Sequence, residues 1–189
     1  GLNLISFPTE GYVFINDGID DDIEDQISFV IGESVATAQL DGEWVGSLTT
    51  FEGGRGYWIN SNIDLSFQYN LDNLSLSRKK TDFSPSKNNM FEFNQSKVQA
   101  FYFMDLKDLH NSNISIGDWI IAYNNDVVVG SRQWNGSIVD VPVMGYDGNN
   151  NTSGYCNNND LPIFKVYSLE NDNFSNLYSD DITGFSSNS

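Results

Sequence analysis

The chain has 189 residues, of which 39% are hydrophobic and 14% aromatic, so its composition is too apolar for a disordered protein. Its formal net charge is -17, with 26 acidic and 9 basic residues, which would repel a phosphate backbone and excludes nucleic acid as an expected partner. The single cysteine, Cys156, excludes an internal disulfide and a cysteine-based zinc site. Apolar runs fall short of the roughly 18 residues that a membrane helix needs, so membrane insertion is not expected.

Residues 1–72 alternate between short apolar strings and turn signals. Residues 2–8, LNLISFP, are typical of a strand that ends at Pro8. Near residues 20–29, isoleucines at helical spacing among acidic residues predict one short amphipathic helix. We therefore expect a β-rich module here. The remaining strand signals are the strings at 34–40, 42–48, 54–61 and 63–69, punctuated by Asp41-Gly42 and Gly53-Gly54.

The rest of the chain divides into a linker, a second module and a tail. Residues 73–90 lose the apolar period and contain RKK, serines and a proline, which predicts a linker. Residues 91–169 return to strand formers, with a tight turn at Asn124-Asn125, and predict a β-sandwich module. The acidic, serine-rich residues 170–189 are expected to fray or to lead to another module. The predicted class is mainly β, with two small sandwiches or partly open barrels in tandem.

Two sets of motifs resemble known modules. The segment VIGESVATAQLDGEWVGSLTTFEGGRGYWINS, residues 30–61, resembles a domain of large exported proteins of marine bacteria, in which VIGEGVA, WVGSL and GYW recur. The strings FEFNQSKVQAFYF, GDWIIAYNNDVVVGSRQWNG, DVPVMGYDG and GYC resemble a second module that often follows the first. The resemblance implies repeats of secreted, cell-surface or virion-surface proteins, with neighbouring modules of a longer chain as partners. It implies no active site.

Catalysis is not predicted from the residues. The only histidine, His110, lies in the polar string DLHNSNIS and reads as an exposed loop residue rather than a catalytic base. Cys156 has no histidine near it in the sequence, and we expect it to be a small buried hydrophobe. Counting carboxylates does not exclude the paired acids of a glycosidase, but modules of this size offer little depth for a cleft.

An Asn-rich loop is a candidate calcium site. Asp147, Asn149 and Asn151 place side-chain oxygens at alternate positions, as calcium loops do, and Asp160 adds a carboxylate. The loop is not a complete EF-hand, because Thr152 stands where a glycine is expected and no glutamate closes the pattern. Asx turns that satisfy the backbone are the alternative.

Carbohydrate recognition is suggested by arginines close to aromatic residues, because sugar rings stack on aromatic faces while Arg, Asp and Asn bond the hydroxyls. As an alternative for the second module, Trp134 is core and Arg132 bonds Asp140 or Asp147. Trp58 and Trp119 are expected in the core. The predicted ligand-contact residues are Arg132, Trp134, Tyr146 and Asp147 in the second module and Trp44, Arg55 and Tyr57 in the first.

The sequence therefore predicts a noncatalytic extracellular segment for adhesion, display or carbohydrate recognition. Its expected partner is a glycan or a surface protein, and calcium is its one candidate cofactor. The alternatives are a structural spacer without a ligand and an accessory region of a secreted hydrolase. A recognition module predicts exposed aromatic residues clustered on one face, whereas a spacer predicts no ligand.

Overall fold

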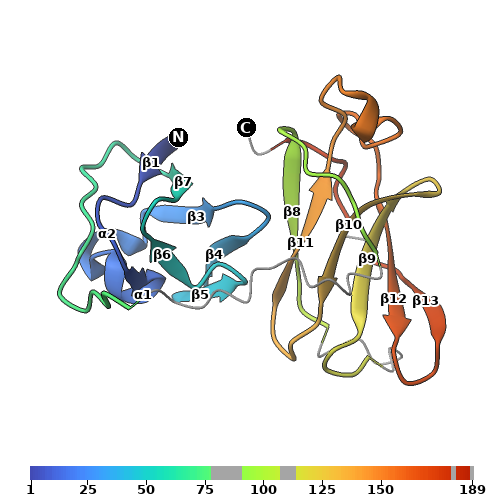
Figure 1. Cartoon of the computed structure of the whole chain (residues 1–189), viewed down its shortest axis with the longest axis horizontal. Coiled ribbons are helices and arrows are strands. Elements are labelled where there is room, and N and C mark those ends of the chain that lie inside the picture. The colour runs from blue at the N-terminus through green and yellow to red at the C-terminus, as the bar shows by residue number, and fades with distance from the viewer. Residues whose placement is uncertain (78–90, 107–113, 180–181, 188–189) are drawn as a thin grey trace. The chain divides into compact units, whose positions relative to one another are not determined.

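The computed structural model describes residues 1–77, 91–106, 114–179 and 182–187, and the chain forms two compact units, Gly1–Lys87 and Asn88–Ser189 (Figure 1). The division falls inside the predicted linker, residues 73–90. However, Leu74 packs against the core of the first unit and Ser75 exchanges backbone hydrogen bonds with Tyr12. The first module therefore extends beyond residue 72. No helix of the described residues is long and apolar enough to cross a membrane.

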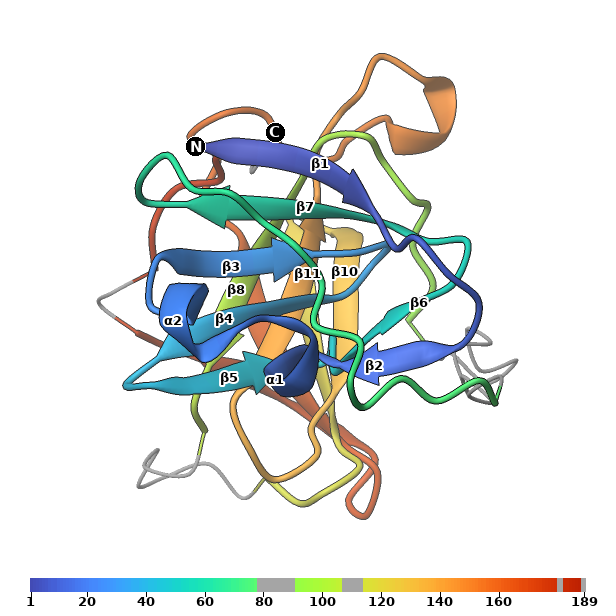
Figure 2. The same ribbon diagram turned by 90° about the vertical axis from the view of Figure 1, so that its left-hand side faces the viewer.

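The first unit is built on an antiparallel five-stranded sheet in the order β1-β7-β3-β4-β5. Two short helices, α1 and α2, lie over one face of this sheet (Figure 2), and a two-stranded sheet, β2-β6, contributes to the same core. The elements are β1 Leu2–Ser6, β2 Tyr12–Phe14, α1 Ile15–Gly18, α2 Asp21–Glu24, β3 Ile27–Ile31, β4 Ala36–Leu40, β5 Glu43–Gly46, β6 Thr50–Glu52 and β7 Gly56–Ser61.

Strand alternation decides which side chains of β7 enter this core. Tyr57 and Ile59 point inward, and Val30 of β3 lies opposite Ile59. Trp58 lies between them and therefore points to the other face, where 41% of it is exposed. The prediction that Trp58 is a core residue is wrong, because its two neighbours occupy the inward positions.

The helix predicted near residues 20–29 is shorter than expected. Helix α2 covers only Asp21–Glu24, and strand β3 has already begun at Ile27. An additional helical turn, α1, precedes it. Ile19 and Ile27 are both buried in the core, so the isoleucine spacing that suggested one helix spans a helix-to-strand junction.

Residues 63–69 were predicted to form a strand, but they cover the core without joining a sheet. Leu65, Phe67 and Tyr69 pack against the core cluster at alternate positions. The ring of Tyr69 meets the ring of Phe51 edge-on, with 4.9 Å between their centroids. The alternation of apolar residues here therefore belongs to a segment that covers the core and not to a hydrogen-bonded strand.

The second unit is a sandwich of a four-stranded sheet, β10-β9-β12-β13, and a two-stranded sheet, β11-β8. Apolar side chains of both sheets meet in one core cluster. The described residues thus form several separate sheets without a closed barrel, which confirms the mainly β class. The elements are β8 Gln99–Met104, β9 Trp119–Asn124, β10 Val127–Gln133, β11 Val139–Met144, a single 3-10 turn η1 Asn150–Thr152, β12 Ile163–Ser168 and β13 Asn173–Leu177.

The turns predicted at Asp41-Gly42 and Asn124-Asn125 both fall at hairpins. Asp41 and Gly42 have positive φ angles of 51° and 84°, the conformation that a two-residue hairpin turn requires. The second turn lies one residue later than predicted, because Asn124 pairs with Val127 and Asn125 takes the positive φ of 53°.

Residues 170–179 and 182–187 belong to the fold, which corrects the prediction that the tail frays. Strand β13 pairs with β12 along its whole length. Phe185 is 2% exposed and lies in the sandwich core, where its backbone bonds Asn159 and Asp160. The second module therefore does not end at residue 169.

Substitution of Phe185 by alanine should lower the free energy of unfolding by about 3 to 5 kcal/mol, because a buried ring is replaced by a cavity. Phe174 is a matched control, since it comes from the same stretch but is 52% exposed, and Phe174→Ala should cost less than about 1 kcal/mol. Urea unfolding of the two variants measures both values. Equal losses would contradict the placement of Phe185 in the core.

Candidate recognition surface

The four-stranded sheet of the second unit has an aromatic outer face. Alternation along β9 sends Ile120 and Ala122 into the sandwich core and leaves the residues between and beside them on the opposite face. We call this surface the aromatic face. It consists of Trp119, Ile121 and Tyr123 from β9, Lys165 and Tyr167 from β12, Phe174 from β13, and Phe91, which packs on it.

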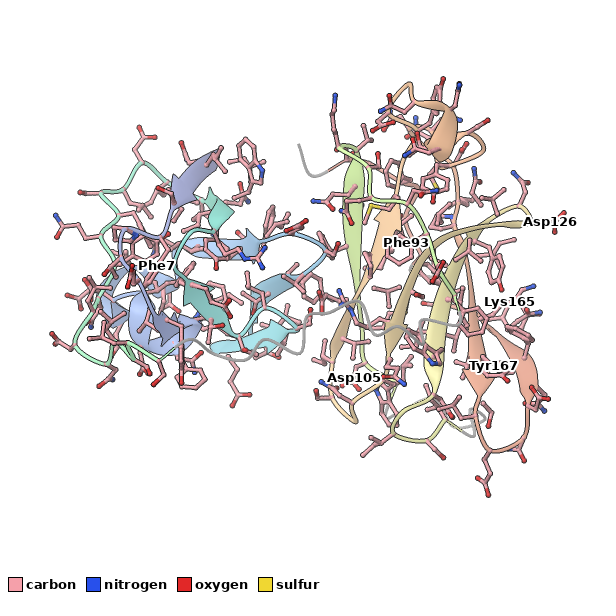
Figure 3. The ribbon with its side chains drawn as sticks, in the orientation of Figure 1. Phe7, Phe93, Asp105, Asp126, Lys165 and Tyr167 are labelled. Carbon is pink, nitrogen blue, oxygen red and sulfur yellow. The ribbon has the colours of Figure 1, made fainter. Side chains whose placement is uncertain are left out.

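Strand pairing arranges the aromatic face in cross-strand rows. In the first row, Trp119 lies opposite Tyr167, which in turn lies opposite Phe174. In the second row, Lys165 lies between Ile121 and Asn176. Lys165 and Tyr167 follow each other along β12 on this side of the unit (Figure 3).

Phe91 closes one part of the aromatic face. Its ring centroid lies 6.1 Å from that of Trp119, 5.3 Å from that of Tyr167 and 5.8 Å from that of Phe174. The hydroxyl of Ser131 donates a hydrogen bond to the backbone oxygen of Phe91, which fixes this cover. Trp119 and Tyr167 are consequently buried, whereas Phe174 stays exposed.

Polar groups stand beside the open part of the aromatic face. The Nζ atom of Lys165 lies 4.8 Å from the centroid of the Tyr123 ring, a cation–π contact. Both side chains are half-buried, and Asn176 beside them is exposed. The Tyr167 hydroxyl donates to Asp172, and this hydrogen bond raises the pKa of Tyr167. Rings, an ammonium and an amide thus lie together on one rigid sheet.

The predicted residues Arg132 and Trp134 have structural contacts. The Nε of Arg132 donates to the backbone oxygen of Asp140 at 2.9 Å, and its guanidinium pairs with the fully buried Asp140 carboxylate at 3.1 Å. Trp134 is half-buried against the sandwich core and donates from its indole nitrogen to the backbone oxygen of Ser137. A buried carboxylate needs such a partner, so Arg132 is engaged within the protein.

Tyr146 and Asp147 begin the Asn-rich loop. Tyr146 is 47% exposed, while Asp147 organises the loop from within. One carboxylate oxygen of Asp147 accepts from the Thr152 hydroxyl at 2.7 Å and from the backbone and side-chain nitrogens of Asn149 at 3.1 and 3.0 Å. The Thr152 hydrogen bond, together with those from Asn149, lowers the pKa of Asp147 to about 2. This is the Asx chemistry that the sequence allowed as the alternative to calcium.

The residues predicted to hold calcium lie in separate hydrogen-bonded networks. Asp160 accepts from the backbone nitrogen of Asn157 at 2.8 Å, and the backbone oxygen of Asn151 accepts from the side chain of Asn94. Neither network includes the Asp147–Asn149 contacts. In the described part of the chain, no group of three or more His, Cys, Asp or Glu residues is arranged to hold a metal ion. Calcium at these positions stays a prediction.

The three residues predicted in the first unit serve different purposes. Trp44 packs against the core and donates to Glu24 at 3.3 Å, and Arg55 pairs with Glu33 at 2.9 Å near the surface. Tyr57 is 3% exposed and accepts from the backbone nitrogen of Glu52, and its burial raises its pKa to about 12. The burial of Tyr57 removes it from any surface contact, so these residues do not form one site.

Arg55 does border an open hollow of about 590 Å³ in the first unit, with Glu10, Tyr12 and Glu52 among its other lining residues. The connection after β1 and the turn before β7 form its walls and are joined by a backbone hydrogen bond from Phe7 to Arg55. Trp44 and Tyr57 do not line it.

Of the two residues considered for catalysis, the structure describes Cys156 but not His110. Cys156 is buried as predicted, and burial is the main reason that its pKa rises to about 11. Its thiol therefore stays protonated at neutral pH, which disfavours a role as a nucleophile. His110 lies outside the described residues.

Sequence reasoning did not select Tyr123, Lys165 or Phe174. The run WIIAYN of β9 did contain a relevant pattern. The residues that point to either face of this strand are mostly apolar, which is typical of a strand that is covered on both faces. Phe174 lies in the predicted tail, residues 170–189, and Lys165 lies among the strand formers of residues 91–169, where no arginine or tryptophan drew attention to it. Tyr123, Lys165 and Phe174 share one sheet face only because β9 pairs with β12 and β12 pairs with β13.

The carboxyl group of Asp147 should titrate near pH 2 in the folded protein, below its ordinary value of 3.8. Because the folded pKa is lowered, the hydrogen bonds stabilise the loop above pH 3.8, and this contribution is lost as the pH falls through about 2. Thr152→Val removes the strongest donor and should move the midpoint toward 3.8. Carboxyl NMR titration measures both midpoints, and an unchanged midpoint in the variant would contradict this assignment.

Comparison of the chain with protein-family models, curated protein sequences and solved structures finds no match. What the aromatic face can bind is therefore inferred from its own side chains.

Proposed function

We propose that this chain is a noncatalytic segment of an exported surface protein and that its second unit recognises carbohydrate through the aromatic face. The supporting observation is the open part of that face, where exposed Phe174 and half-buried Tyr123 lie on the same sheet surface as Lys165 and Asn176. Sugar rings place their C–H faces against aromatic rings, while amide and ammonium groups bond the hydroxyls.

The aromatic rings are held in place before any ligand arrives. Phe174 contacts the ring of Tyr167 at 5.0 Å and that of Phe91 at 5.8 Å between centroids, and Tyr167 is itself buried and hydrogen-bonded to Asp172. Side chains that are already ordered lose little conformational entropy on binding. A sheet also positions its side chains more rigidly than a loop does.

An extracellular location is part of the proposal. The motifs at residues 30–61 and their counterparts in the second module resemble repeats of large exported proteins. A net charge of -17 would keep such a protein soluble and would discourage binding to other acidic macromolecules. Adhesion or display on a cell or virion surface is the role that fits both features.

A glycan-array screen of the full chain tests carbohydrate recognition, with Phe174→Ala as the informative variant. Loss of one stacking ring should weaken binding of the array ligands by about five- to tenfold, since such a contact contributes on the order of 1 kcal/mol. The midpoint temperature of thermal unfolding of Phe174→Ala should stay close to that of the parent protein, because the ring is exposed.

Tyr146→Ala is the matched control, because Tyr146 is similarly exposed but lies on the Asn-rich loop. It should leave the affinity unchanged. Selective loss of binding in Tyr146→Ala would transfer the site to the loop, and absence of any bound glycan would leave the structural spacer as the better account.

A further inference from the structure

Lys165 occupies the middle of the aromatic face. Strand pairing gives it Ile121 on one side and Asn176 on the other, and its Nζ is held over the Tyr123 ring. The aliphatic stem of a lysine can pack along such apolar neighbours while the ammonium stays at the surface. A positive charge is thus fixed beside the rings that would contact a sugar.

The charge of Lys165 has no carboxylate partner among the described residues. The ion pairs found there join Arg55 to Glu33 and Arg132 to Asp140. Lys97 also has no ion pair among the described residues, so what sets Lys165 apart is that its ammonium lies on the aromatic face, over the Tyr123 ring. The carboxylate of Asp172 on the same side of the sheet accepts from the hydroxyl of Tyr167 instead.

The surroundings of Lys165 would strengthen its attraction for an anion. Hydrophobic neighbours reduce the local dielectric, so a charge–charge contact made there is worth more than one made in open water. The negative charge of the rest of the chain acts over longer distances, and salt at physiological strength screens it beyond about 8 Å. Short-range attraction at Lys165 can therefore coexist with long-range repulsion.

We infer that the aromatic face selects carbohydrates that carry an anionic group, a carboxylate or a sulfate, and that the ammonium of Lys165 binds this group. The inference rests on the proposed function, because it names the class of sugar that the same surface would bind. Asn176 lies opposite Lys165, and its side-chain nitrogen donates one hydrogen bond to the Tyr178 hydroxyl at 2.9 Å, which leaves its second N–H to bond a ligand oxygen next to Lys165. The neighbouring rings supply affinity that does not depend on charge.

The test compares uronic acid oligosaccharides with the same oligosaccharides after reduction of their carboxyl groups, so that only the charge differs. Calorimetry with the full chain at physiological salt should show about two- to fivefold tighter binding of the acidic form, the range of a partly exposed ion pair. Lys165→Gln should abolish this preference, so that the acidic and neutral forms bind equally, and Lys165→Arg should retain it. Sulfated and desulfated pairs distinguish the two kinds of anion.

Lys97→Gln is the control for net charge, because Lys97 belongs to the same unit but is exposed outside the aromatic face. It should leave the preference intact. Equal binding of the acidic and neutral forms by the parent protein would overturn the inference and leave the proposed function standing. Equal effects of Lys97→Gln and Lys165→Gln would also overturn it. Absence of binding to every oligosaccharide, including the glycan array, would overturn both proposals.

Discussion

Burial of β9 on both of its faces is the constraint on which the second unit depends. Ile120 and Ala122 are fully buried in the sandwich core, and Ile121 between them is as completely buried on the opposite face. A strand covered twice needs covering groups from outside its own hairpin. Phe91, which precedes the sheet in the sequence, packs on Trp119 and Tyr167 of this face, and Phe174 of β13 contacts both Phe91 and Tyr167.

Incomplete covering of the same sheet creates the candidate surface. Phe91 seals the part of the aromatic face above Trp119 and Tyr167, and the rings that remain accessible lie beside Lys165. The exposed ring of Phe174 is supported by buried neighbours, which is a common way to hold a binding residue without loss of stability. Packing and proposed recognition are thus two properties of one sheet face.

Local patterns in the sequence were sufficient for the fold class and the hairpins, because alternation and turns such as Asp41-Gly42 depend on neighbouring residues alone. They were not sufficient for Trp58 and Phe185, whose burial is decided by which phase of a strand faces the core and by long-range packing. The site prediction was limited in the same way. Arg132 was chosen for its proximity to a tryptophan, whereas the fold pairs it with a buried carboxylate.

NMR mapping of a bound glycan on the isotope-labelled full chain would show whether the aromatic face is the binding surface. Chemical shifts should change together on β9, β12 and β13, around Tyr123, Lys165 and Phe174, and should stay unchanged in the Asn-rich loop and the hollow beside Arg55. Shifts confined to that loop or hollow would contradict the proposed function, because the ligand would then bind where the aromatic face makes no contribution.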